Sequence, residues 1–217
     1  MEVISTFDRN AEDYDIWYRE ESGKLAFESE ARAIEVLGLK GFGVEVGIGT
    51  GVFSLRLDVP LGLDPASRMI KMAKRKGIDV VRAVGESLPI KNNCLDYVLF
   101  ALTICFLRSL QDSLREAWRV LRPRGNIIVG FISQGSEWGK LYSRKKVEGH
   151  RFYRYANFYT VEEVEKALGR ADFKIQKCLG TLSQKPGAVT AIEEPSSDVS
   201  QLGFVCIKAT KMQKQAH

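Results

Sequence analysis

Three glycines alternate with other residues at positions 47, 49 and 51, in the stretch "GVEVGIGTG" that begins at Gly43. They follow a short apolar run that contains one acid, Glu45. Because glycine has no side chain, a glycine turn between a strand and a helix lets a polar, nucleotide-like ligand approach the backbone closely. A tight turn alone would not need three glycines. We therefore expect a ligand at this turn.

A second acid, Asp64, lies about 20 residues after Glu45, where nucleotide-binding folds place the acid that accepts hydrogen bonds from ribose hydroxyls. The dinucleotide fingerprint Gly-x-Gly-x-x-Gly would require a glycine where this chain has Val52, so the spacing disfavours NAD. An Asp-Pro pair also commonly begins a helix. Both roles can hold for Asp64, because the ligand edge and the helix start coincide there.

Apolar strands alternate with amphipathic helices around these residues, which predicts an α/β fold with a doubly wound, mostly parallel sheet. We expect a turn at 122–126. Strands are expected over 44–46, 60–64, 79–84, 95–102, 126–132, 173–182 and 203–211, and helices over 11–37, 50–57, 65–77, 109–121 and 160–171.

Four stretches resemble, in order and spacing, the class I S-adenosylmethionine-dependent methyltransferases: "VEVGIGTG", "GLDPASRMIKMAKRKG", "GESLPIKNNCLDYVLFAL" and "LREAWRVLRPRGNIIVGF". The nearest group includes the ubiquinone/menaquinone biosynthesis enzymes and many small-molecule methyltransferases. The resemblance, which covers about 7–210, implies S-adenosyl-L-methionine as cofactor and a Rossmann-like sheet of seven strands with the last strand antiparallel. It implies one methyltransferase domain over 1–217, with a helical lid at about 7–38, a core at about 40–133, a cap at about 134–160 and a closing helix and strands at about 160–210.

The same resemblance implies where the cofactor binds. The glycine turn would approach the methionine part, and N–H groups of the helix that begins near Thr50 would bind its carboxylate. Glu45 would lie near the amino end of the cofactor or order the turn. The cofactor residues that we expect are Glu45, Gly47, Ile48, Gly49, Thr50, Gly51, Asp64, Pro65, Met69, Gly85, Glu86, Tyr14 and Tyr18.

Within this set, Asp64 would bind the ribose, while Pro65 and Met69 would pack on the adenine. Val84 stands where the family has an acid for the adenine amino group, so its recognition would depend on the backbone of Gly85 or on Glu86. Tyr14 and Tyr18 match the N-terminal lid. They fit simple packing of the first helix onto the sheet equally well.

Methyl transfer from a sulfonium is an in-line displacement, so alignment and exclusion of water can supply most of the rate acceleration. The segment "ALTICFL", at 101–107, should lie where the methyl group emerges, and it contains no histidine, acid or lysine. We therefore assign no catalytic residue. Four cysteines and two histidines without Cys-x-x-Cys pairs supply a zinc site poorly, so we expect no metal.

An aromatic and basic segment at 135–159 follows the fifth expected strand, where family members commonly insert substrate-binding helices. Ordinary packing with a charged outer face explains the segment equally well. Trp138, Tyr142 and Tyr153 are candidates for the wall of a substrate pocket. The candidates for contact with an anionic group are Lys145, Lys146, Arg151 and Arg154.

We predict methyl transfer to a small-molecule acceptor. The alternatives are an RNA or protein methyltransferase, a non-catalytic S-adenosylmethionine-binding protein and an NAD-dependent oxidoreductase. The net charge of +5 allows nucleic-acid binding but favours it only slightly.

No apolar run approaches the ~20 residues that span a bilayer. The N-terminus resembles neither a signal peptide nor a transit peptide, so we expect a cytoplasmic protein. The tail after Lys211 is expected to be disordered.

Overall fold

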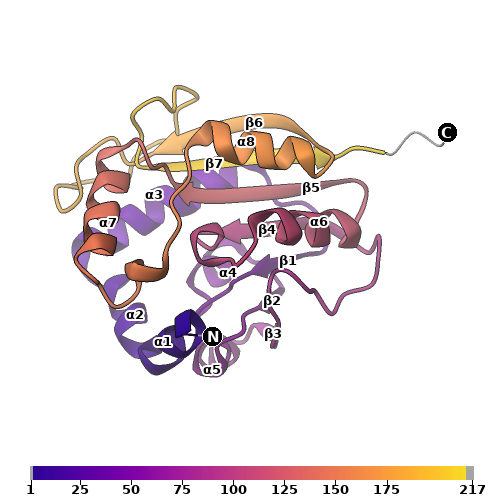
Figure 1. Ribbon diagram of the computed structural model, residues 1–217, viewed down its shortest axis with the longest axis horizontal. Helices are drawn as coiled ribbons and strands as arrows, with labels where there is room; N and C mark the ends of the chain where they lie inside the picture. Colours follow the sequence, from indigo (N-terminus) through magenta and orange to yellow (C-terminus); the bar gives the residue numbers. More distant parts are fainter. Residues whose placement is uncertain (1, 214–217) are drawn as a thin grey trace.

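A seven-stranded sheet forms the centre of the computed structural model, which describes residues 2–213. The pairing is parallel from β3 through β5, and β7 is antiparallel to both of its neighbours. The predicted α/β fold with an antiparallel last strand is confirmed (Figure 1). In their order across the sheet the strands are β3 (Asp79–Val81), β2 (Leu61–Leu63), β1 (Gly43–Val46), β4 (Leu95–Ala101), β5 (Leu121–Ile132), β7 (Phe204–Lys211) and β6 (Phe173–Thr181).

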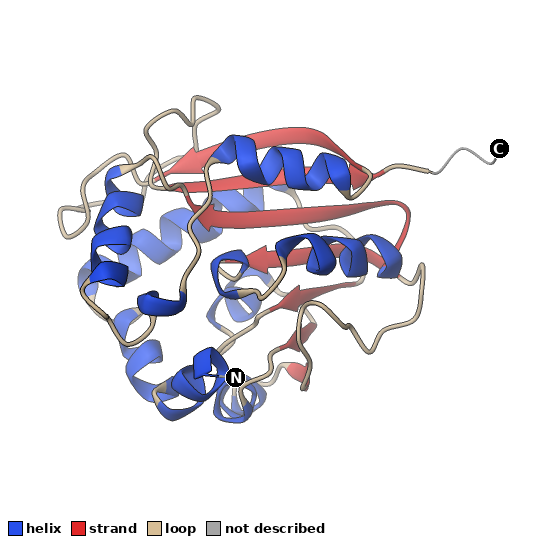
Figure 2. Ribbon diagram, viewed as in Figure 1, coloured by secondary structure: helices blue, strands red, loops and turns tan. Residues whose placement is uncertain are grey.

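Helices cover both faces of the sheet, as Figure 2 shows. On one face lie α6 (Leu110–Val120) and α8 (Val161–Arg170), and on the other lie α3 (Glu21–Leu37) and α4 (Val52–Leu57). A further helix, α5 (Ser67–Arg75), packs beside β3 at the sheet edge. Thr160 is the N-cap of α8 and forms a capping box with Glu163.

The core has two layers because successive side chains of a strand point to opposite faces. In β4, Val98 and Phe100 pack in the layer that contains α6 and α8. Tyr97 and Leu99 pack in the layer that contains α3 and α4. All four are buried, which agrees with the nearly continuous apolar sequence of a central strand.

Short elements from distant parts of the chain gather at the end of the sheet toward which the parallel strands point (Figure 1). The glycine turn, which follows β1, lies at this same end of the sheet. These elements are α1 (Glu2–Arg9), α2 (Ala11–Trp17), η1 (Ile104–Phe106), α7 (Glu137–Val147) and η2 (Tyr153–Tyr155).

Three expectations about element boundaries were wrong. The chain bends at residues 18–20, so the single helix expected over 11–37 is two, and the bend buries Tyr18. Strand β5 begins at Leu121 and includes the expected turn, with Arg124 at φ 65°. Pro65 precedes α5 instead of occupying its first turn. Helix α1 had not been predicted.

Within residues 2–213, no helix combines the length and the apolar character that crossing a membrane would require. The tail that we expected to be disordered lies mostly outside the described residues.

Candidate active site

The glycine turn adopts a backbone that side chains disfavour, with positive φ at Gly47 (75°), Gly49 (56°) and Gly51 (82°). The surroundings differ between positions. A Cβ atom on Gly47 would meet the Thr103 side chain, and one on Gly51 would lie 2.7 Å from Ile78 Cδ1. Packing therefore excludes a side chain at Gly47 and at Gly51 even without a ligand. Gly47 and Gly49 line a cavity, whereas Gly51 does not.

This first cavity, of about 840 Å³, lies at the carboxyl ends of β1, β2 and β4. We call it the cofactor cavity. Among the residues predicted to bind the cofactor, those that line it are Tyr14, Gly47, Gly49, Asp64, Pro65, Met69, Gly85 and Glu86.

Asp64 directly follows β2 and connects the glycine turn to the start of α5. One carboxylate oxygen accepts the N–H of Gly49 (3.0 Å) and the other accepts the N–H of Ala66 (2.8 Å). Burial raises the pKa of Asp64 to about 6, and the two N–H groups oppose that rise. Because each carboxylate oxygen can accept a further hydrogen bond, Asp64 can still bind a pair of hydroxyls in the cavity that it lines.

Glu45 lies beneath the turn and lines neither this cavity nor the second one described below. It is 1% exposed and accepts a hydrogen bond from the Ser54 hydroxyl of α4. Burial raises its pKa to about 8. Of its two expected roles, the geometry therefore favours ordering of the turn. Ile48 and Thr50 are also buried outside both cavities.

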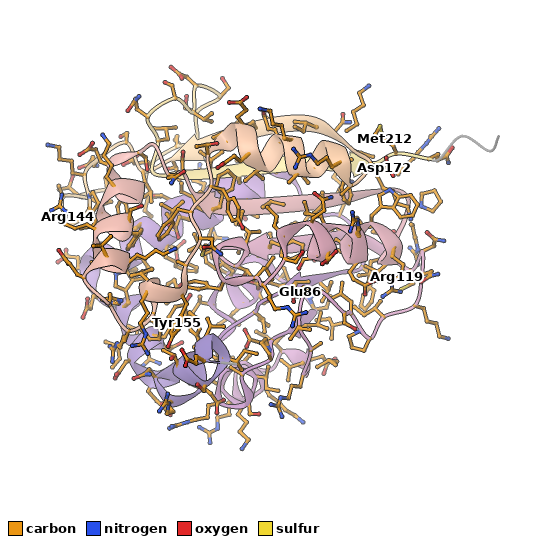
Figure 3. All side chains as sticks on the ribbon, viewed as in Figure 1. Glu86, Arg119, Arg144, Tyr155, Asp172 and Met212 are labelled. Carbon is orange, nitrogen blue, oxygen red and sulfur yellow. The ribbon has the colours of Figure 1, made fainter. Side chains whose placement is uncertain are left out.

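The side of the cavity expected to bind adenine is mostly apolar. Met69 is buried, and Val84, which replaces the expected acid, also lines the cavity. Glu86 lies beside the loop that leads into α6 (Figure 3). One of its oxygens accepts the N–H groups of Arg108 (2.7 Å) and Ser109 (3.1 Å), so Glu86 is partly engaged by protein.

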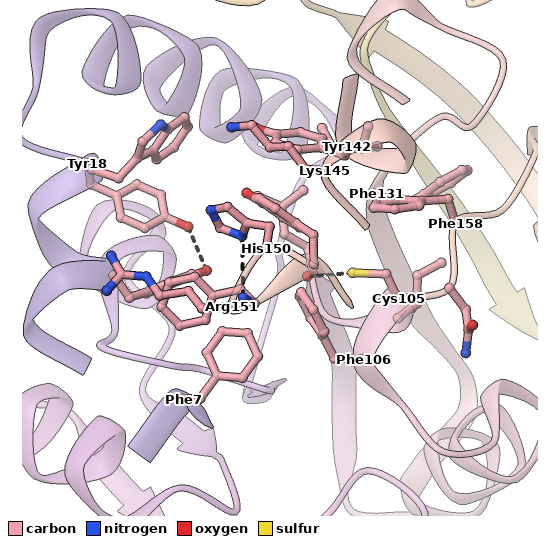
Figure 4. Close-up of a pocket in the computed structure, with 18 of the residues that line it drawn as sticks. Phe7, Tyr18, Cys105, Phe106, Phe131, Tyr142, Lys145, His150, Arg151 and Phe158 are labelled. Carbon is pink, nitrogen blue, oxygen red and sulfur yellow. Dashed lines mark hydrogen bonds between the residues drawn. The ribbon is translucent and has the colours of Figure 1, made fainter. Parts of the chain in front are cut away.

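A second cavity, of about 410 Å³, lies beside the first between the N-terminal helices and the 135–159 segment (Figure 4). We call it the acceptor cavity. Tyr14 lines both cavities. Its hydroxyl oxygen lies 2.9 Å from the hydroxyl oxygen of Tyr18. The residues that the two cavities share are Phe7, Tyr14, Leu102, Phe106 and Asn157.

Two of the three aromatic substrate candidates line the acceptor cavity. Tyr142 and Tyr153 do so, with ring centroids 4.4 Å apart. Trp138 does not line it. Its indole N–H donates to the carbonyl of Gln184 (2.8 Å), and its ring covers Gly203, so it anchors the loop after β6.

Two of the four basic residues that were candidates for contact with an anionic group line the acceptor cavity. Lys145 and Arg151 line the acceptor cavity. Lys146 donates to the carbonyl of Ala156, and Arg154 lies over the Tyr155 ring, so neither of them does.

Tyr18 was predicted to close over the cofactor but lines only the acceptor cavity. This difference follows from the bend after α2, which turns its ring toward Phe27 and Phe53.

Glu30 and His150 are among the titratable residues of the acceptor cavity that the sequence interpretation missed. Glu30 is 1% exposed, and burial raises its pKa to about 8. It occupies the apolar stripe of α3, between Phe27 and Ile34 at helical spacing, and an acid in such a position is a signal that could have identified it.

His150 is held neutral by its surroundings. Burial, Lys145 and Arg151 lower its pKa. Its Nδ1 accepts the N–H of Phe152 (3.3 Å), which assigns the ring proton to Nε2. Nε2 is therefore a hydrogen-bond donor, and Nδ1 is occupied by the Phe152 N–H. Neither ring nitrogen is free to accept a proton, so we do not assign His150 as a general base.

Neither metal nor thiol chemistry has support in this region. No cluster of histidine, cysteine and acidic side chains within residues 2–213 could hold a metal ion. Cys105 lines the acceptor cavity, but burial raises the pKa of its thiol to about 12, so it stays protonated.

The fold and the site define a class: an α/β protein that holds a nucleotide-type ligand where its parallel strands end, with a second pocket against it. Comparisons with known proteins agree. Residues 44–129 match the methyltransferase domain family. An uncharacterized protein of Methanocaldococcus jannaschii is 35% identical over 96% of this chain and all of its own length.

A solved structure from Thermotoga maritima, a S-adenosylmethionine-dependent methyltransferase described as a possible histamine N-methyltransferase, is 32% identical. The match covers 96% of this chain and 99% of that one, with a TM-score of 0.92. The ubiquinone/menaquinone biosynthesis C-methyltransferase of Rickettsia felis is 28% identical over 58% of this chain and 54% of its own.

The chain belongs to the S-adenosylmethionine-dependent methyltransferases. It is therefore an enzyme, and its cofactor is S-adenosyl-L-methionine. The oxidoreductase and non-catalytic alternatives lose their support. The residues that line the cofactor cavity fit this cofactor. The backbone of Gly47 and Gly49, the Asp64 carboxylate and the apolar Met69 side chain all line the same cavity.

Proposed function

We propose that the enzyme methylates a small-molecule acceptor bound in the acceptor cavity. The observation that carries this proposal is the shared wall: five residues line both cavities, so an acceptor in one lies next to a cofactor in the other. The smaller cavity, about 410 Å³, is within the size range of small-molecule sites.

The cofactor, when bound, supplies a methyl group on a positively charged sulfur. We propose that Gly47 and Gly49 receive its methionine part, that Asp64 binds its ribose, and that Pro65 and Met69 pack on its adenine. Tyr14, from the N-terminal helices, stands between the cavities and would align the two ligands and exclude water. The lid, core, cap and closing segments, and the cytoplasmic location, stay predictions.

The side chains of the 135–159 segment give less support to an RNA acceptor. Its aromatic rings are buried or half-buried, including Trp138, Tyr142 and Phe152, whereas stacking of RNA bases needs exposed rings. The description of the Thermotoga maritima relative also names a small molecule.

A transfer experiment with methyl-labelled cofactor tests the proposal. The enzyme is incubated with a metabolite extract, with RNA and with protein in separate reactions. We expect label in the metabolite fraction, and label confined to RNA or protein would contradict the proposal. Tyr153→Ala, which removes an aromatic wall of the acceptor cavity, should raise the KM for the acceptor. Lys140→Ala, on the exposed face of α7, should leave that KM unchanged.

A further inference from the structure

A buried carboxyl group without a complete set of partners faces the acceptor cavity. Glu30 is 1% exposed, and its Oε2 atom has no hydrogen-bond partner within residues 2–213. Among the ion pairs formed by these residues, none includes Glu30. Burial of such a group is costly unless something satisfies it, so each case in a native fold calls for an explanation.

Aromatic rings surround this carboxyl group. Tyr14, Tyr18, Tyr142 and Tyr153 line the same cavity. Burial raises the pKa of each of these tyrosines, and the nearby charge of Glu30 adds to the rise. Their negative ring faces and a carboxylate together form an environment that attracts a cation.

The charged groups of the other cavity walls have different partners. Arg151, half-exposed, pairs with Asp13 of α2 at 2.6 Å. The Nζ atom of Lys145 lies 5.5 Å from the Tyr142 ring centroid and 5.8 Å from that of Tyr153. Glu20 is exposed at the rim, and the pKa of His150 is lowered, so its ring is neutral. None of these groups neutralises Glu30.

We propose that the acceptor is an organic amine whose ammonium group binds Glu30 between the tyrosine rings. This inference rests on the proposed small-molecule function and names the substrate class of that same site. An ammonium would give the free carboxylate oxygen a charge-assisted hydrogen bond and would gain a cation–π contribution from the rings. An acceptor with a carboxylate there would meet Glu30 as a like charge.

Binding should be coupled to a proton. Burial raises the pKa of Glu30 to about 8, so at neutral pH the carboxyl group of the free enzyme holds its proton. A neighbouring ammonium favours the carboxylate, so the amine should displace that proton on binding. Amine affinity should therefore rise from pH 6 to pH 8.5, below the range in which an alkylamine loses its own charge.

Calorimetry on the enzyme saturated with S-adenosylhomocysteine tests the proposal. The probes are propylamine, 2-phenylethylamine and tryptamine, each paired with its alcohol isostere, in two buffers of different ionisation enthalpy. We expect at least one amine to bind about tenfold more tightly than its alcohol, with proton release to the buffer. If no amine exceeds its alcohol fivefold, the proposal is wrong.

Glu30→Gln keeps the size of the side chain but removes the charge. It should abolish both the amine preference and the proton release. Glu35→Gln, on the exposed face of the same helix, should keep both. Thermal melting and S-adenosylhomocysteine affinity establish that each variant is folded. Retention of the preference by Glu30→Gln would overturn the proposal.

The two proposals fail in different ways. Label transfer to a neutral or acidic metabolite, without amine preference, would contradict the amine inference and leave the small-molecule function standing. Label found only in RNA or protein would contradict both.

Discussion

The two carboxylate oxygens of Asp64 have a structural role and a proposed role in binding the ribose. Its carboxylate already holds the N–H of Gly49 in the glycine turn and that of Ala66 before α5. The ribose hydroxyls would use the remaining lone pairs of the same oxygens. A change at this position should therefore affect both the turn and the ligand.

Asp64→Ala should weaken S-adenosylhomocysteine binding about tenfold or more, because charge-assisted hydrogen bonds are lost and the turn is released. Isothermal titration calorimetry measures this directly. Asp79→Ala, at the exposed start of β3, is the matched control and should bind normally. An unchanged affinity in Asp64→Ala would show that the ribose role is misassigned.

At the residue scale, the sequence allows a prediction where a residue type has few alternative roles. A glycine turn after an apolar strand, and an acid that ends the next strand, both indicate a ligand edge, and Gly47, Gly49 and Asp64 line one cavity. Glu30 was missed because an acid in a helix usually faces water. Only the partner elements decide that its position on α3 faces a cavity.

At the scale of the elements, the connection from β1 to α4 depends on a glycine for reasons of packing. Gly51 has φ 82°, and a Cβ atom there would lie 2.7 Å from Ile78 Cδ1 and 3.0 Å from Ala73 Cβ. Gly77, after α5, has a similar φ of 89°, but apart from its chain neighbours no atom of residues 2–213 lies within 4 Å of its Cβ position. Alanine substitutions at Gly51 and Gly77 therefore distinguish the effect of backbone strain from that of overpacking.

Gly51→Ala should lower the free energy of unfolding by about 2–4 kcal/mol, the sum of left-handed strain and overpacking. Gly77→Ala should lower it by only about 1 kcal/mol, since strain acts alone. Urea unfolding followed by circular dichroism measures both. Equal losses in the two variants would mean that the contact with Ile78 relaxes at no cost.

The elements that were predicted incorrectly depend on contacts between distant segments. The bend after α2 places Tyr18 against Phe27 and Phe53, and α1 packs on α5. Trp138 was expected at a substrate because aromatic residues in a cap often are. Its anchor is a carbonyl 46 residues further along the chain, which no local pattern indicates.

At the scale of the whole molecule, burial raises the pKa of three acids among residues 2–213: Glu30 and Glu45 to about 8 and Asp64 to about 6. Their ordinary values are 4.5, 4.5 and 3.8. At a pH between the ordinary and the raised pKa of these acids, the folded state holds more protons than the unfolded state. The free energy of unfolding therefore falls as pH rises through this range. The lowered pKa of His150 acts in the opposite direction around its ordinary value of 6.5 and offsets part of the loss.

The ligand-free enzyme should therefore unfold at a lower urea concentration at pH 8.5 than at pH 5.5. The double variant Glu30→Gln, Glu45→Gln should show a flatter profile, because two of the three raised carboxyls no longer titrate. Urea midpoints across this range test the prediction. A midpoint that rises steadily with pH would contradict it.

The two cavities draw on different parts of the chain. The matched domain region, 44–129, contains the glycine turn and Asp64. Apart from the short stretch 102–106, the walls of the acceptor cavity come from residues before 31 and after 130. Phe7, Tyr14 and Asn157 of these flanking segments also line the cofactor cavity. An exchange of the flanking segments can therefore change the acceptor and keep the methyl donor only if it preserves these shared walls.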